Sequence, residues 1–367
     1  MMNFSLLSAV SVLASTIIGA GIFSLPFIFK NVGLLFGAFY LFLFAAVYGA
    51  IHYMYVRVLQ TTEEKHQFTY FAEKYLGTRL GKIVGGAVLL ELFFVLTAYL
   101  VLAPQFISIA IGISGWQALI LFWILGSIVI FIPSRLLGWA DLFGIGSILL
   151  IVGIIVMRGG QNAALIPAAQ PLNWFLFLLP FGPLLFSLSG RPALASIVEE
   201  WRRARKSFSL GGAILLGTFI PAIVYFFFVV GVLRLNPFVS PEALTSLTTL
   251  PLFLYSLLGA LGIVALWTSY FMIGISARDT IQEDMRASSW ISACTVLFLP
   301  LILVVISSTT FLSLISFIGG IFLALEGVVV ITMWRRAFPQ HSLRNVVLPL
   351  YSVFVAAFLF EILRLFI

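Results

Sequence analysis

The sequence predicts an all-α integral membrane protein with about eleven transmembrane helices, of which the first and the sixth are broken. The chain has 367 residues, of which 62% are hydrophobic and 9% are charged, and its mean hydropathy is +1.17. Soluble proteins carry about 25% charged residues, so a chain this apolar could not cover its own surface in water. We therefore expect one transmembrane domain over residues 1–367, with the lipid bilayer around it and no nucleic-acid partner.

Apolar runs bounded by charged or turn residues give the positions of the spans, because a helix needs about 20 apolar residues to cross a bilayer. The predicted spans are 5–29, 33–58, 83–111, 116–133, 139–157, 173–200, 209–233, 250–277, 290–306, 310–334 and 346–366. The division between the ninth and tenth spans rests on the break at residues 307–310, since residues 290–334 are too long for one crossing.

Lysine and arginine are distributed unevenly over the predicted loops, and this bias gives the orientation. With a cytoplasmic N-terminus, the inside would hold Arg57, Lys65, Lys74, Arg79, Lys82, Arg135, Arg202, Arg203, Arg205, Lys206, Arg278, Arg286, Arg335, Arg336 and Arg344. The outside would hold Lys30, Arg158, Arg234 and Arg364. We therefore expect an N-terminus in the cytoplasm, a C-terminus outside, and a location in the cytoplasmic membrane of a prokaryotic cell. The net charge of +7 is then a signal of topology.

The residues that commonly hold metals or perform catalysis are few and scattered. Cys294 is the one cysteine and lies in an apolar run, so neither an intrachain disulfide nor a cysteine metal site can form. The three histidines, His52, His66 and His341, are far apart in the sequence. We therefore expect no enzyme activity, no metal and no cofactor, and we expect a monomer.

Two of the predicted spans, the first and the sixth, are interrupted by glycine and proline. Such breaks free backbone polar groups that hydrocarbon cannot satisfy, so they persist where they line a cavity or bind a ligand. The interruptions are Gly19, Gly21 and Pro26 in the first span and Pro180, Gly182, Pro183, Gly190 and Pro192 in the sixth. One interrupted span in each half of a chain is typical of the central binding site of a transporter.

The spans also divide into two halves of opposite orientation, because each half has an odd number of crossings. The halves are predicted inverted repeats at about 5–157 and 173–334, and the helix at about 346–366 is an addition. The two interrupted spans then occupy equivalent positions, one at the start of each half.

Three motifs resemble those of a known family. Residues Ile18–Pro26 resemble the first-helix signature of amino-acid permeases in the amino acid/polyamine/organocation superfamily, most closely the hydroxy and aromatic amino-acid permeases and the auxin/amino-acid permeases. Residues Phe186–Leu194 resemble the unwound sixth helix of that family, and residues Thr268–Phe271 resemble its eighth. The resemblance implies a LeuT-like fold with alternating access and secondary transport of amino acids driven by protons or sodium. Arg191 departs from the family pattern, which more often has a neutral side chain or a histidine there.

The breaks suit a zwitterion, because unwound segments present amides, which favour a carboxylate, and carbonyls, which favour an ammonium group. Packing of small residues between helices is the alternative reading. The candidate substrate-binding residues are Ile18, Gly19, Ala20, Gly21, Ile22, Phe186, Ser187, Ser189, Gly190 and Tyr99.

The candidate ion-coupling residues are polar side chains inside predicted spans: Glu91, Glu326, Arg191, Thr268 and Ser269. Buried carboxyl groups such as Glu91 and Glu326 suit proton uptake and release, whereas the hydroxyls of Thr268 and Ser269 could bind sodium or bond back to their own helix. Arg191 has three readings: contact with the substrate carboxylate, an ion pair with either glutamate, or a fixed charge in place of a coupling cation. A further reading places it in the cytoplasmic vestibule.

The sequence therefore predicts a symporter of amino acids, of aromatic or other neutral type, that works by alternating access. We favour protons over sodium as the driving ion, because two buried glutamates are present and the family members it most resembles are proton-coupled. The alternative function is an amino-acid sensor or germinant-receptor-type subunit, which would bind the same ligand on the same fold without moving it.

Overall fold

The computed structural model describes residues 4–64, 66–130, 138–161, 173–236, 238–284, 287–306 and 309–366. Every regular element of these residues is helical. In chain order the elements are α1 (Phe4–Ile17), η1 (Ala20–Ser24), α2 (Leu25–Val32), α3 (Leu34–Leu59), α4 (Phe68–Leu76), α5 (Thr78–Ile111), α6 (Gly115–Ile130), α7 (Gly138–Gln161), α8 (Trp174–Leu178), α9 (Phe181–Leu188), α10 (Arg191–Arg203), α11 (Leu210–Leu235), η3 (Leu244–Thr249), α12 (Leu252–Asp284), α13 (Ser289–Ile306), α14 (Phe311–Phe317), η4 (Ile318–Leu323), α15 (Ala324–Ala337), η5 (Ser342–Arg344) and α16 (Leu348–Arg364).

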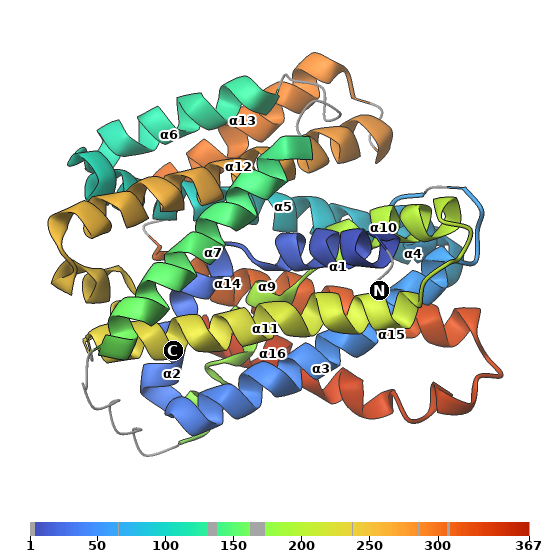
Figure 1. Ribbon diagram of the computed structural model, residues 1–367. Coiled ribbons are helices and arrows are strands. Elements are labelled where there is room, and N and C mark those ends of the chain that lie inside the picture. Colours follow the sequence, from blue (N-terminus) through green and yellow to red (C-terminus); the bar gives the residue numbers. More distant parts are fainter. Residues whose placement is uncertain are drawn as a thin grey trace.

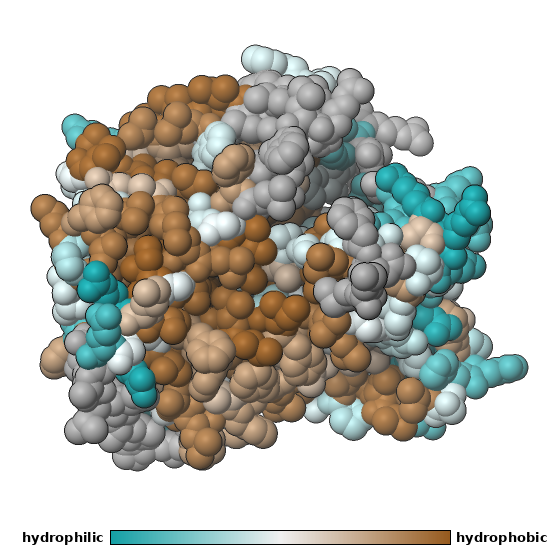
Figure 2. All heavy atoms as spheres, in the orientation of Figure 1, coloured by the Kyte–Doolittle hydropathy of each residue, from teal (hydrophilic) through white to brown (hydrophobic). Residues whose placement is uncertain are grey.

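The helices match the predicted spans. Within the described part, 9 helices are long and apolar enough to cross a membrane, or 10 if α1 and the η1–α2 arm count as one span bent by 49°. Helix α6 is apolar but shorter. Each predicted span therefore has a counterpart. Outside the described residues lie the end of the predicted fourth span (131–133), residues 307–308 of the break between the ninth and tenth spans, and Lys65, Arg135 and Arg286. Figure 2 shows a broad hydrophobic surface with hydrophilic residues concentrated toward its ends.

The broken helices lie in the interior of the bundle. In Figure 1 most helices run side by side across the view, with α1 and α9 near the middle, α5 and α12 above them and α3 and α11 below. Helix α1 packs on α10 and α11, η1 packs on α9, and α5 packs along α12. The two interrupted segments are therefore surrounded by protein rather than by lipid.

The basic segments that were predicted to share one side of the membrane lie at one end of the molecule. Three basic segments meet at the right of Figure 1. They are helix α4 with Lys74, the last turn of α10 with Arg203, and the last turn of α15 with Arg336. The compartment that this end faces stays a prediction. The sequence pattern did not predict α4, a nine-residue helix that buries Phe68 and Phe71 against the bundle.

A third interruption, which was not predicted, lies in the tenth span. Between α14 and α15 the chain forms a π-helix, η4, around Gly319 and Gly320. A Cβ atom added to Gly319 would lie 2.7 Å from the carbonyl carbon of Gly182 in α9, so α9 and η4 approach backbone to backbone. π-Helical turns inside α-helices are frequent at functional sites, and this one directly precedes the helix that carries Glu326.

Candidate functional site

The first helix is broken at the predicted glycine. Helix α1 ends at Ile17, Gly19 is extended (φ −136°, ψ −158°), and the chain continues as the 3₁₀ turn η1. The last carbonyls of a helix have no partner within it. The carbonyl oxygen of Ile17 accepts a hydrogen bond from the hydroxyl of Tyr225 in α11, at 2.5 Å. A side chain from another span thus satisfies a backbone group that the break has freed.

The sixth helix is broken between α9 and α10, at Ser189 and Gly190. Side chains of other helices also reach its freed groups. The Tyr48 hydroxyl donates to the carbonyl of Leu185 at 2.7 Å, and the Tyr225 hydroxyl lies 3.0 Å from the carbonyl oxygen of Ser187. Both carbonyls lie in the last turn of α9, where helix ends leave orphan acceptors.

The amide of Gly190 fixes the protonation state of a buried histidine. Gly190 N–H donates to His52 Nε2 at 3.2 Å, and His52 Nδ1 lies 3.1 Å from Thr218 Oγ1. Because Nε2 accepts, the neutral ring carries its proton on Nδ1 and donates it to Thr218. His52 therefore holds the start of α10 in place from α3.

The two breaks touch each other. A Cβ added to Gly21 would lie 2.8 Å from Cα of Ser187, and one added to Gly190 would lie 2.8 Å from side-chain atoms of Ile17 and Leu13. These contacts allow no side chain at either glycine without a shift of backbone or core. Only glycine permits this approach, which brings the backbone groups released by the two breaks into one region.

Of the remaining candidates, the substrate residues Tyr99, Ile18 and Ile22 lie beside the first break, whereas the ion-coupling candidate Thr268 is turned elsewhere. The Tyr99 hydroxyl interacts with the backbone of Ala20 and with Ser269 of α12, and it lies 3.6 Å from where a Cβ on Gly19 would be. Ile18 and Ile22 are buried on either side of the break. Thr268 instead donates to the carbonyl of Ala265 at 3.0 Å and contacts Gly144 of α7.

Three further candidate residues, two with hydroxyls and one with a ring, belong to the sixth helix. Ser187 donates to the carbonyl of Pro183 at 2.7 Å, so its hydroxyl supports α9 just before the break. Ser189 interacts with Tyr48, and Phe186 is half-buried against the core. The described contacts thus bring Ser187 and Gly190 to the first broken helix, which Tyr99 also reaches through the backbone of Ala20, whereas Ser189 faces Tyr48 of α3.

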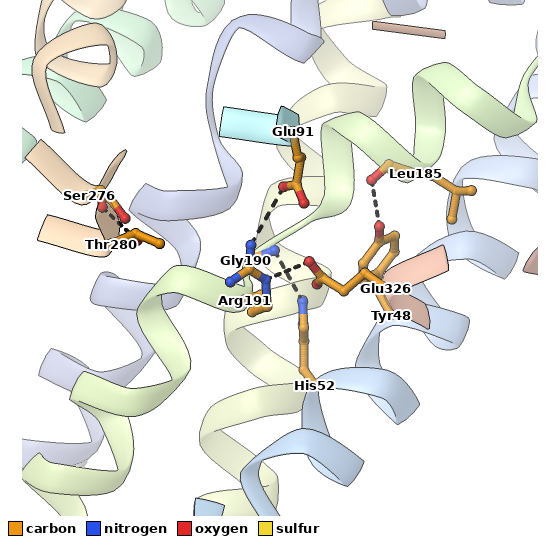
Figure 3. Close-up of polar contacts among 9 residues, drawn as sticks. All are labelled: Tyr48, His52, Glu91, Leu185, Gly190, Arg191, Ser276, Thr280 and Glu326. Carbon is orange, nitrogen blue, oxygen red and sulfur yellow. Dashed lines mark hydrogen bonds and ion pairs between the residues drawn. The ribbon is translucent and has the colours of Figure 1, made fainter. Parts of the chain in front are cut away.

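A buried charge cluster lies at the start of α10, beside the breaks. Arg191 Nε lies 2.5 Å from Glu326 Oε2 in α15, and Arg191 Nη2 lies 3.6 Å from Glu91 Oε1 in α5. The side chains are 14%, 6% and 9% exposed, respectively, and the Phe68 ring lies 5.0 Å from the guanidinium carbon. Figure 3 shows Arg191 between the two carboxylates. Of the readings given for Arg191, the structure contains the ion pair, with both glutamates.

The charges in this cluster do not balance. One guanidinium faces two carboxyl groups, and Glu91 Oε2 is buried without a hydrogen-bond partner among the described residues. An unpaired charge in a membrane protein interior is costly. The cluster reaches neutrality when one of its carboxyl groups carries a proton.

Several of these residues were not identified from the sequence. Tyr48 and Tyr225 are two of 11 tyrosines in the chain, and no spacing marks them as partners of the breaks. Only their place on α3 and α11, helices that pack on the broken ones, gives them this role.

Known proteins agree with this architecture. Residues 2–325 match the family described as "Transmembrane amino acid transporter protein", while no curated protein matches the chain. Among solved structures, a manganese transporter of Eremococcus coleocola in complex with an aromatic bis-isothiourea substituted compound is similar at a TM-score of 0.63 and 13% identity, over 97% of this chain and 85% of that one. The inward-facing conformation of Mhp1 gives a TM-score of 0.58 and 14% identity, over 98% and 89%.

At these identities the solved structures establish the fold, which is that of LeuT-type membrane transporters and not of enzymes. The match to the sequence family extends over both broken helices and ends just before Glu326. The protein is an integral membrane protein, and the chain belongs to the family of transmembrane amino acid transporter proteins.

Proposed function

We propose that this protein is a symporter that moves neutral amino acids, aromatic ones among them, together with protons by alternating access. The observation that carries the proposal is the meeting of the two helix breaks, where Gly21 contacts Ser187 and Gly190 contacts Ile17. Freed carbonyls of both halves lie in one protein-enclosed region, as a ligand with an ammonium group requires. The motif at Ile18–Pro26 supports amino-acid substrates of the hydroxy and aromatic permease type.

The charge cluster supports a neutral rather than an acidic substrate. Arg191 is engaged by Glu326 and Glu91, so its guanidinium is not free for a second carboxylate. The substrate carboxylate would instead meet backbone amides in the first turn of the η1–α2 arm, beside the Ala20 backbone that Tyr99 contacts, where the partial positive charge of a helix terminus favours an anion.

The same cluster supports proton coupling. A proton on Glu91 balances the cluster, and its loss leaves one excess negative charge inside the membrane domain. Sodium binding at Thr268 is less well supported, because that hydroxyl bonds to Ala265 within its own helix. We therefore assign the coupling proton to the pair formed by Glu91 and Glu326.

The distribution of polar contacts among the helices supports alternating access. Tyr48, His52 and Tyr225 connect α3 and α11 to the broken helices, whereas Arg191 connects α10 to α5 and α15. We infer that the broken helices move with α3 and α11 against α5, α12 and α15, and that protonation loosens the Arg191 contacts. Each of the two groups takes helices from both proposed inverted repeats. We place the protein in a prokaryotic membrane with the N-terminus in the cytoplasm.

Proteoliposomes test the function. Radiolabelled phenylalanine and other neutral amino acids should accumulate when the lumen is more alkaline than the bath, and a protonophore should abolish the accumulation. A sodium gradient alone should have no effect. Accumulation that follows sodium would overturn the choice of ion, and amino-acid binding without accumulation would identify a sensor instead of a transporter.

Replacement of Glu91 by glutamine should separate binding from coupling. Glu91→Gln keeps the shape of the side chain but fixes its neutral form, so the variant should exchange amino acid across the membrane and no longer concentrate it under a pH gradient. Counterflow and gradient-driven uptake measure these two activities. Glu361→Gln is the matched control, since Glu361 is a buried carboxyl group of α16 paired with Arg364 at 3.5 Å. Gradient-driven accumulation by Glu91→Gln at the wild-type level would contradict the assignment.

A further inference from the structure

Tyr225 is the one described side chain whose hydroxyl reaches carbonyl oxygens of both helix breaks. It lies in α11, is fully buried, and has its hydroxyl 2.5 Å from the Ile17 oxygen and 3.0 Å from the Ser187 oxygen. Ile17 is the last residue of α1, the first arm of the first broken helix, and Ser187 lies in the last turn of α9. Tyr225 therefore spans the two halves at the point where the proposed ligand binds.

The Tyr225 hydroxyl has one hydrogen fewer than the two carbonyl oxygens beside it need. A phenol has a single O–H hydrogen, while two carbonyl oxygens face it. The shorter contact, to Ile17, takes that hydrogen, and the Ser187 oxygen then faces the hydroxyl without one. Buried backbone acceptors without a donor are uncommon and costly, so this place favours an additional donor group.

We propose that Tyr225 is a positioning residue for the ammonium group of the substrate, an inference that rests on the proposed function. Its hydroxyl fixes the spacing of the Ile17 and Ser187 carbonyls and leaves one of them open to an N–H donor of the ligand. The aromatic ring serves as a rigid spacer that α11 holds in place. Thr218, two turns earlier on α11, supports the second break through His52, so one helix sets the geometry of α9 and α10 at two points.

The test compares two identical substitutions. Tyr225→Phe removes the hydroxyl and keeps the ring. Tyr270→Phe is the matched control, because Tyr270 in α12 is also fully buried and its hydroxyl has no hydrogen-bond partner among the described residues. The loss of one hydrogen bond to the positioned carbonyls should raise the KM for a neutral amino acid about fivefold to tenfold, with little change in kcat, whereas Tyr270→Phe should leave KM unchanged.

A ligand without the ammonium group separates positioning from general packing. Calorimetric titration of the purified protein with phenylalanine and with 3-phenylpropionate should show that Tyr225→Phe weakens binding of the amino acid and leaves that of the deaminated analogue unchanged. Equal weakening of both ligands, or no weakening of either, would overturn the inference. If the wild-type protein binds no amino acid at all, the proposed function fails first, and the two failures are thereby distinguishable.

A third variant covers the case in which Tyr225→Phe does not fold. 4-Aminophenylalanine at position 225 offers two N–H hydrogens, one for each carbonyl, and should fold with a melting temperature at or above that of the wild type. Because both carbonyls are then occupied, its KM for the amino acid should exceed that of the wild type. A wild-type KM in this variant would contradict the role of the open carbonyl.

Discussion

Replacement of Arg191 by methionine is expected to destabilise the protein more than any other single change in the site. The Arg191 guanidinium lies between two carboxyl groups, with Nη2 3.6 Å from Glu91 Oε1 and Nε 2.5 Å from Glu326 Oε2. Without it, two carboxyl groups face each other in the membrane domain. Removing one partner of a buried ion pair costs about 3–5 kcal/mol, because the remaining charge loses its compensation. Arg191→Met should therefore melt at a markedly lower temperature and transport nothing.

Neutralising the partners should rescue stability but not coupling. The triple variant Arg191→Met, Glu91→Gln and Glu326→Gln contains no uncompensated charge, and buried ion pairs can often be replaced by neutral groups of similar volume without loss of stability. Its melting temperature should return toward that of the wild type, while accumulation under a pH gradient stays absent. A wild-type melting curve for Arg191→Met alone would mean that the cluster does not stabilise the fold.

A methyl group at Gly21 should separate the two breaks and abolish high-affinity binding. The new Cβ would lie 2.8 Å from Cα and 2.9 Å from Cβ of Ser187. Because these atoms belong to or adjoin the backbone of α9, rotation of a side chain cannot relieve the contact. Overpacking of this kind costs about 1–3 kcal/mol. If the cost applies to the ligand-bound state, it corresponds to about a 5- to 150-fold loss of affinity. Titration calorimetry with a neutral amino acid measures it.

Gly19 provides the control for Gly21 within the same break. A Cβ at Gly19 meets its nearest atom, the Tyr99 hydroxyl oxygen, at 3.6 Å, and its extended backbone suits any residue. Gly19→Ala should therefore fold normally and lose much less affinity than Gly21→Ala. Equal affinities in the two variants would show that contact between the breaks does not shape the ligand site.

The interrupted helices could be predicted from the sequence because their signals are local. Glycine and proline weaken a helix wherever they stand. A broken helix persists inside a membrane only where protein or a cavity surrounds its freed backbone groups. The break at Gly19 and the break at Ser189–Gly190 fall at the predicted places. Arg191 and the two glutamates were also visible, since any charge inside an apolar run is conspicuous.

The partners of those groups depend on how helices distant in sequence pack together. Arg191 was predicted to pair with Glu91 or Glu326, and it contacts both, which no spacing along the chain reveals. Tyr48 and Tyr225 have apolar neighbours in sequence and are indistinguishable there from tyrosines that face lipid. The π-helical turn at Ile318–Leu323 arises from close packing of Gly319 against α9, a tertiary cause without a local signal.

Protection of the break by its ligand tests the central claim most directly. With Cys294→Ser as the background, Gly19→Cys places a thiol at the first break, where a Cβ has room, and Gly86→Cys places one on an exposed face of α5. Methyl methanethiosulfonate should label both variants, and a transported neutral amino acid should slow labelling of Gly19→Cys alone. Labelling of Gly19→Cys at an unchanged rate under saturating amino acid would contradict binding at the helix breaks.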